Sequence, residues 1–372
     1  ASTDQLGRFV KSHGLDIPYS GRGFAQGRVS GARGDVHVRD IDLELELESS
    51  SMTLKAGGTI GPIGPEVQFN MPFTIDARDL AGLAKPLGVL GEKVPTGFSG
   101  HAQARLVGER KALNISEIKL AISSDIVTIN AGGSVVSLGP NAECDLDVDA
   151  SVVDIGAMDH LLELPLDDYL AIGAKGSARI QYTAGRTIIT ELRGTFAGDG
   201  IRNGRFSGEV PDIARFGASS LAIDVELVDI GRFAQQLHIN PSYSDSVKLK
   251  ASLVGAPEPN APYFLTLDIK TDALKALIHG HVNSLAKGTG FKLNGHLKTD
   301  DVIKLNDLLN SELPGAGPLS LDVTIHRADG VTQPLKGRLN LDATDIKASV
   351  AGDIAWPLRS GMHVDARVEA QS

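Results

Sequence analysis

Apolar and polar residues alternate along many short stretches of this chain. In the segment 319–326, LSLDVTIH, every second residue is Leu, Val or Ile, and the residues between them are polar. The segments 41–48 (IDLELELE) and 146–152 (LDVDASV) alternate in the same way. A period of two predicts β-strands with one apolar and one polar face. Near the end of the chain this pattern predicts four strands, at about 319–326, 335–342, 346–354 and 362–370.

A second pattern, led by aspartate, recurs at a nearly fixed spacing. The phrase VDIG occurs at 153–156 and again at 228–231, and related phrases open with Asp elsewhere. Aspartate is a favourable N-cap residue, so each phrase predicts a helix of about two to three turns. The five anchors are Asp4, Asp79, Asp154, Asp229 and Asp301, spaced by 75, 75, 75 and 72 residues. A fixed period indicates a repeat architecture.

Together the two patterns predict one short helix followed by about four antiparallel strands in each repeat. The predicted fold is mainly β: an elongated, curled antiparallel meander of about 20 strands with an aliphatic interior. We expect a single elongated repeat domain of five repeats, 4–78, 79–153, 154–228, 229–300 and 301–372. Because the chain opens at a helix anchor and closes after the last strand of a repeat, without added capping repeats, we expect it to be a fragment of a longer protein.

Composition narrows the classes of partner. Hydrophobic residues make up 42% of the chain, aromatic residues only 5%, and there are 42 glycines, which suits short strands and tight turns. The net charge of −10 argues against a nucleic-acid partner and against simple electrostatic docking of the chain onto anionic lipid. Cys144 is the only cysteine, so an intrachain disulfide is excluded. No apolar run reaches the roughly 18 residues that span a bilayer.

The sequence contains little candidate chemistry. Asp145–Asp149 has the acidic spacing of a calcium loop but alternates as a strand and lacks the glycine that such a loop requires. His279 and His281 share one face of a predicted strand, without an evident third metal ligand. No Gly-x-Ser-x-Gly motif is present. Cys144 has the parity of the apolar residues after it and should face inward. We therefore predict no enzyme, no metal and no cofactor.

The candidate site is the apolar face of the strands. A folded sheet lined by aliphatic side chains with few aromatic residues would form a furrow suited to an acyl chain. The same residues would also serve if the faces packed together as a dry core, and the pattern leaves both structures open. The predicted lining residues are Leu43, Leu45, Leu54, Leu146, Val148, Val152, Ile180, Leu192, Phe196, Leu221, Ile223, Val225, Leu249, Leu253, Leu267, Ile269, Ile278, Leu319, Leu321, Val323 and Ile325.

The last repeat resembles a known family. The segments 301–327 (DVIKLNDLLNSELPGAGPLSLDVTIHR) and 335–354 (LKGRLNLDATDIKASVAGDI) are similar to the AsmA-like family, whose phrase is an Asp-led, Leu-rich helix, a Pro/Gly break and strands of the form G-x-L-x-L-D. The phrases at Asp154 and Asp229 match less completely. The residues that carry the resemblance best are Asp301, Leu308, Leu309, Pro314, Gly317, Leu319, Leu321 and Asp322.

The resemblance implies a repeating β-groove, or β-taco, in a bridge protein of the Gram-negative envelope. It implies a periplasmic location within a protein anchored in the inner membrane. The implied partners are phospholipid acyl chains, the inner and outer membranes through segments outside this chain, and an envelope protein. The implied function is non-enzymatic movement of phospholipid between the two membranes. The main alternative is a periplasmic scaffold or outer-membrane assembly factor that acts through β-edge contacts. A surface adhesin ranks last, because no linkers separate the repeats.

Overall fold

A computed structural model describes most of the chain. The described residues are 2–3, 21–32, 34–47, 51–64, 66–80, 97–110, 112–138, 142–155, 172–198, 200–213, 218–228, 246–256, 258, 261–284, 289–303, 317–327, 335–343, 346–354 and 364–371. Nearly all of them lie in antiparallel β-strands, which confirms the predicted mainly-β fold. The chain divides into two compact units, Ala1–Thr190 (unit 1) and Glu191–Ser372 (unit 2). The boundary lies inside strand β11 (Arg186–Gly198) and therefore within the third repeat.

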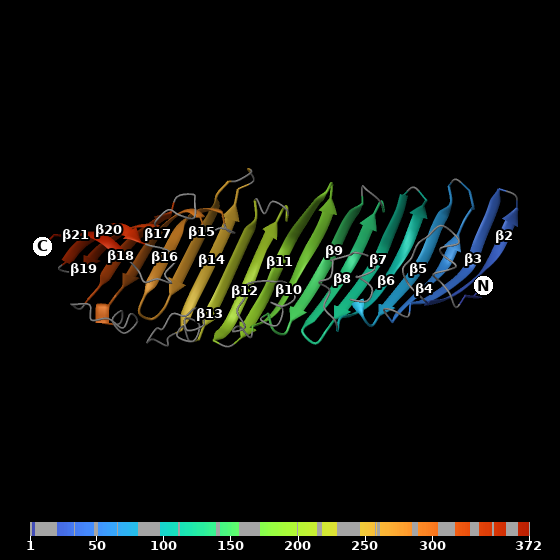
Figure 1. Cartoon of the computed structure of the whole chain (residues 1–372), viewed down its shortest axis with the longest axis horizontal. Coiled ribbons are helices and arrows are strands. Elements are labelled where there is room, and N and C mark those ends of the chain that lie inside the picture. Colours follow the sequence, from blue (N-terminus) through green and yellow to red (C-terminus); the bar gives the residue numbers. More distant parts are fainter. Residues whose placement is uncertain are drawn as a thin grey trace. The chain divides into compact units, whose positions relative to one another are not determined.

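Unit 1 is a meander in which each strand pairs antiparallel with the next, from β1 to β10 (Figure 1). The described register pairs β1 only with β2 and does not join it to β10, so this sheet is open among the described strands. Its strands are β1 (Ser2–Thr3), β2 (Gly21–Ala32), β3 (Asp35–Leu47), β4 (Met52–Ile60), β5 (Gln68–Ala77), β6 (Ser99–Glu109), β7 (Ala112–Ser123), β8 (Val127–Val136), β9 (Glu143–Val152) and β10 (Ile172–Thr183).

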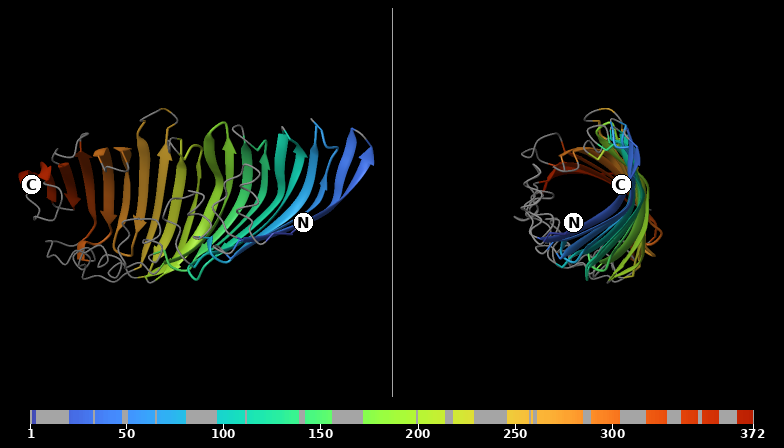
Figure 2. Two further views of the ribbon diagram at one scale, coloured as in Figure 1. Left: turned by 45° about the vertical axis from the view of Figure 1, so that its right-hand side comes forward. Right: turned by 90° about the vertical axis from the view of Figure 1, so that its right-hand side faces the viewer.

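Unit 2 repeats this topology from β12 to β21, and its described strands also leave the sheet open. The strands of each unit curve, so each sheet has a concave and a convex side (Figure 2). The strands are β12 (Ile201–Val210), β13 (Ser220–Leu227), β14 (Val247–Gly255), β15 (Tyr263–Lys270), β16 (Lys275–Ser284), β17 (Thr289–Thr299), β18 (Leu319–Arg327), β19 (Leu335–Ala343), β20 (Ile346–Ile354) and β21 (Val364–Gln371).

Four strands fall within each predicted repeat interval. The sets are β2–β5, β6–β9, β10–β13, β14–β17 and β18–β21. The last set confirms the four strands predicted from alternation near the end of the chain, to within two residues at each boundary. Alternation therefore identifies these strands because each has one apolar face.

The predicted helices lie mostly outside the described residues. Helical backbone is described at Leu80 and at Val302–Ile303, directly after two of the aspartate anchors. At the second of these, the backbone N–H of Ile303 donates to Oδ1 of Asp301 at 3.0 Å, which is the hydrogen bond of an N-cap. The anchors Asp4 and Asp229 lie outside the described part of the chain, and the segments that follow Asp79 and Asp154 are described only at their start.

One local irregularity recurs with the repeat. Asp40, Glu117 and Glu191, which are 77 and then 74 residues apart, each lie in the second strand of a repeat with φ of 51°, 55° and 53°. Register shifts mark the first two positions as β-bulges. At these bulges an arginine of the preceding strand approaches the carboxylate: Arg28 lies 3.9 Å from Asp40, and Arg105 lies 3.2 Å from Glu117.

Candidate functional site on the apolar face

Cross-strand register places apolar residues opposite one another in unit 1. Leu45 on β3 lies opposite Leu54 on β4, which lies opposite Ile75 on β5. The same row continues through Ala102 on β6 to Leu120 on β7. Because side chains alternate between the two faces of a strand, these partners all lie on one face of the sheet. The result is an unbroken apolar row across five strands.

Unit 2 has equivalent rows. Leu249 on β14 lies opposite Ile269 on β15, and Ile269 lies opposite Ala276 on β16. The row then passes through Leu297 on β17 to Leu321 on β18. All the predicted lining residues in the paired strands have the parity of this apolar face, so register brings together, within each unit, residues that are far apart in the sequence.

Most of the apolar face remains partly exposed. Of the 21 predicted lining residues, 18 are half-buried. Val225 and Leu319 are buried, at 7% exposure each, whereas Ile223 is 42% exposed. A dry core between two packed faces would instead bury most of its large aliphatic side chains. The described part of the apolar face therefore keeps contact with solvent.

Most of the buried apolar residues lie at one end of their strands. Leu47 and Ala77 close β3 and β5 in unit 1, whereas Val247 opens β14 in unit 2. Val302, at the start of the segment after β17, forms a buried cluster with Leu319, the first residue of β18. Burial on this face is therefore greatest along one edge of the sheet.

Phe196 fills space on the apolar face. A Cβ added at Gly204 on β12 would overlap the Phe196 ring, so the ring lies directly over this glycine. Phe196 is the only aromatic residue among the 21 predicted lining positions, and the glycine beneath it allows so large a group to lie close to the sheet.

Register also adds residues to the apolar face that the sequence analysis did not name. They share the parity of the named positions, and several lie on strands whose alternation is interrupted by bulges or glycines. The signal that would have identified them is the parity of their cross-strand partners. Examples are Ile75, Ile118, Leu120, Ile129, Leu297 and Leu341.

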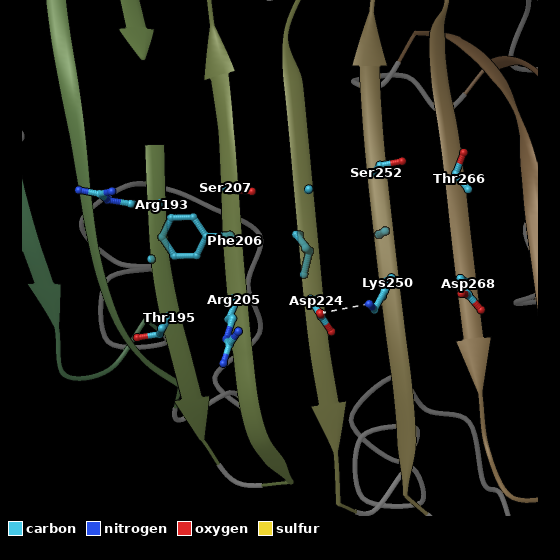
Figure 3. Close-up of a pocket in the computed structure, with 14 residues that line it drawn as sticks. Arg193, Thr195, Arg205, Phe206, Ser207, Asp224, Lys250, Ser252, Thr266 and Asp268 are labelled. Carbon is cyan, nitrogen blue, oxygen red and sulfur yellow. Dashed lines mark ion pairs between the residues drawn. The ribbon is translucent and has the colours of Figure 1, made fainter. Parts of the chain in front are cut away.

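A shallow pocket of about 670 Å³ lies on the opposite, polar face of unit 2 (Figure 3). Its walls include Arg205, Asp224, Lys250 and Asp268, which lie opposite one another on β12 to β15. Nζ of Lys250 lies 3.7 Å from Oδ2 of Asp224. Small residues such as Ser252 form the next row, so charged side chains border a shallow depression. The opposite charges of these four side chains, which alternate from strand to strand, offset one another.

The candidate chemical residues remain isolated in the described structure. The described residues contain no group of three or more His, Cys, Asp or Glu side chains that could hold a metal. Cys144 lies opposite Tyr182 and Val135 on the apolar face, as its parity predicted. Burial, and then the nearby Asp145 carboxylate, raise the pKa of the Cys144 thiol, which disfavours the reactive thiolate.

Asp145 belongs to an ion pair between β9 and β10. Nε and Nη2 of Arg179 donate to its two carboxylate oxygens at 2.8 and 2.5 Å. These hydrogen bonds hold the pKa of Asp145 below its usual range. The Asp145–Asp149 stretch lies within a regular strand, so its carboxylates do not wrap around a shared centre as those of a calcium loop do.

Comparisons with known proteins identify no relative. No family model, no curated protein and no solved structure matches this chain. Within the described residues, no helix is both long enough and apolar enough to cross a membrane.

Proposed function

We propose that this chain is a non-enzymatic lipid carrier whose apolar face holds phospholipid acyl chains. The observation that carries the proposal is the partly exposed apolar face, formed in register across consecutive strands of each unit. Such a face gives non-directional contact along its length, so an acyl chain can shift along it without breaking specific hydrogen bonds. In this proposal the face forms the aliphatic lining of a groove.

The expected strength of contact is compatible with transport. Complete burial of a methylene group contributes about 0.8 kcal/mol, and an open face covers about half of each group. An acyl chain of roughly sixteen carbons would then gain on the order of 6 kcal/mol before the cost of ordering it. A binding free energy of that size is enough to hold a lipid on the face and still allows it to dissociate.

The proposed setting follows from the resemblance of the last repeat to the AsmA-like family. In that setting the chain lies in the periplasm, as part of a protein anchored in the inner membrane, and moves phospholipid between the inner and outer membranes. The half-exposed apolar rows favour this function over a scaffold that acts through β-edge contacts, because such contacts use backbone hydrogen bonds and need no accessible aliphatic surface.

Lipid content tests the proposal directly. The chain is purified without detergent, extracted with organic solvent and examined by mass spectrometry. We expect phospholipid in stoichiometric amount. Lipid-free protein that also fails to bind a fluorescent phospholipid would overturn the proposal.

A matched pair of variants assigns the binding to one face. Ile223 lies on the apolar face and is 42% exposed, whereas its neighbour Ala222 is exposed on the polar face. Ile223→Asp should lower bound lipid severalfold, because the carboxylate would be desolvated by an acyl chain. Ala222→Asp should leave bound lipid unchanged. The buried Val225 is a poorer probe, since Val225→Asp would also destabilise the sheet.

A further inference from the structure

The polar face of the fourth repeat contains a row of four lysines. Lys248, Lys270, Lys275 and Lys298 lie directly opposite one another on β14, β15, β16 and β17. All four side chains are exposed. Neighbouring strands are about 4.8 Å apart, and like charges placed directly opposite destabilise a sheet. An arrangement that costs stability in the free protein is explained if an anionic partner neutralises it.

Further cations surround this row. Lys250 and Lys292 lie on the same face of β14 and β17, so these four strands present six lysines. Asp268 is the one acidic residue within the four strands. We call this polar surface of β14–β17 the basic face. It also includes His279, His281 and His296.

Only part of this charge is offset within the described structure. Lys270 pairs with Asp268 at 2.8 Å, and Lys250 lies 3.7 Å from Asp224 of β13. The other four lysines make no ion pair with a described residue. Asp272 and Asp300 lie just beyond the strand ends, and neither forms a described ion pair with them. The basic face is therefore left with free cationic side chains.

The net charge of the chain conceals this local excess. Elsewhere the polar face is acidic, as on β9, where Glu143, Asp147 and Asp149 alternate along the strand. Charges in solution are screened beyond about 10 Å at 0.1 M salt, so a carboxylate beyond that range has little effect on a ligand at the basic face. The total of −10 therefore does not exclude local binding to an anionic surface.

Apolar side chains are also exposed on the basic face. Val254 and Phe264, which lie directly opposite one another, are 46% and 55% exposed, and Leu277 is 46% exposed. Their parity places them among the lysines rather than on the apolar face. Exposed apolar groups on the same face as lysines match the boundary between lipid headgroups and acyl chains. A nucleic acid or an acidic peptide would account for the lysines but not for the exposed aliphatic side chains of Val254 and Leu277.

We propose that the basic face docks onto the surface of an anionic phospholipid bilayer, with its lysines at the headgroup phosphates and Phe264 and Val254 at the acyl boundary. This docking surface is separate from the apolar face that we propose holds single lipids. The inference therefore does not depend on the proposed function.

Vesicle flotation with the whole chain tests this docking. The two probes are vesicles of phosphatidylcholine alone and vesicles in which about three lipids in ten are phosphatidylglycerol, an anionic fraction that sets the surface potential. We expect binding to the anionic vesicles at about 0.05 M salt and its loss at about 0.5 M salt. Equal binding to both vesicles, or binding that survives high salt, would overturn the proposal and point to the apolar face instead.

Two double variants locate the interaction. Lys275→Glu with Lys298→Glu reverses an opposed pair, so the like-charge contact persists and the fold is preserved. Each lysine near an anionic surface contributes about a fivefold gain in binding, so this variant should bind at least about 30-fold more weakly. The control, Lys119→Glu with Lys175→Glu, makes the same charge change at exposed polar-face positions of unit 1 and should bind like the unmodified chain.

The remaining outcomes are also decisive. Equal loss in both double variants would show that net charge alone governs binding, and would overturn the assignment to the basic face. Soluble polyglutamate that binds the basic face while anionic vesicles do not would identify an acidic protein as the partner instead. Urea midpoints that match among the three proteins establish that each is folded.

Discussion

At the scale of single residues, the Asp145–Arg179 pair shows how one contact depends on pH. Arg179 hydrogen-bonds both carboxylate oxygens and lowers the pKa of Asp145. A carboxylate whose folded-state pKa is lowered contributes stability above its unfolded pKa of about 3.9, and loses that contribution as pH falls through the folded-state value. Both side chains are about 40% exposed, so solvent weakens the pair.

We therefore expect Asp145→Asn to lower the unfolding free energy by about 0.5 kcal/mol at pH 7. The difference from the unmodified chain should begin to shrink below about pH 4 and disappear as pH falls through the lowered folded-state pKa, where the Asp145 carboxylate becomes protonated and uncharged. Urea unfolding at several pH values measures this. Asp147→Asn is the control, because Asp147 makes no ion pair with a described residue, and it should have a smaller effect at pH 7. Equal stability of Asp145→Asn and the unmodified chain at pH 7 would contradict the prediction.

Residue parity could be predicted from the sequence, whereas residue burial could not. Alternation assigned Ile223 and Val225 to the same face, and the register of β13 agrees. Yet Ile223 is 42% exposed and Val225 only 7%. The difference arises because Val225 lies closer to the end of β13, where burial on this face is greatest, and position along that edge is a property of the assembled strands. The same limit applies to the lysine row, whose members are isolated in sequence and meet only through register.

At the scale of elements, adjacent glycines on β8 have different roles. Gly133 has φ of 152°, and a Cβ there would overlap the carbonyl oxygen of Asp145 on β9. Gly132 has an ordinary conformation, and its nearest atom to an added Cβ is the carbonyl oxygen of Ile118 at 3.4 Å. Gly133 therefore permits the close approach of β9 beside a bulge, whereas Gly132 tolerates a side chain.

Gly133→Ala should lower the unfolding free energy by about 1–3 kcal/mol, because alanine must adopt a strained backbone or displace β9. Gly132→Ala should change it by less than about 1 kcal/mol, and can stabilise the strand. Chemical denaturation of the two variants measures the difference, and hydrogen exchange should show that the loss of protection in Gly133→Ala begins at β8 and β9. Two variants of equal stability would show that the backbone at Gly133 relaxes without cost.

The strands themselves could be predicted from the sequence, but their irregularities could not. Strands with one apolar face produce a period of two, which located the four strands of the last repeat. The bulges at Asp40 and Glu117 interrupt that period within β3 and β7, so parity changes partway along each strand. A recurring sequence signal was nevertheless present: arginine precedes each of these acidic residues by 12 positions, as at Arg28 and Arg105.

At the scale of the whole molecule, repeats that contact only their neighbours should be removable one at a time. Deleting residues 229–300 would join the end of β13 to the segment before β18, and the paired residues of β14 and β18 have the same parity. The apolar face would then continue without a change of side. The same deletion removes every lysine of the basic face, because these lie on β14–β17.

We therefore expect deletion of 229–300 to give a folded protein that retains about four-fifths of the bound lipid, in proportion to the remaining repeats, but no longer binds anionic vesicles. Deletion of 79–153 is the matched control: it removes four strands of similar length and should lose a similar share of lipid while keeping vesicle binding. The measurements are urea unfolding, lipid extraction and vesicle flotation. In urea unfolding the m-values of both deletion variants should be lower than that of the whole chain, because less surface becomes exposed on unfolding.

Loss of all lipid in either deletion would show that the apolar face works only as a whole. Vesicle binding by the 229–300 deletion would place docking outside the fourth repeat. Because lipid content and vesicle binding are read separately, the carrier function and the docking surface succeed or fail independently.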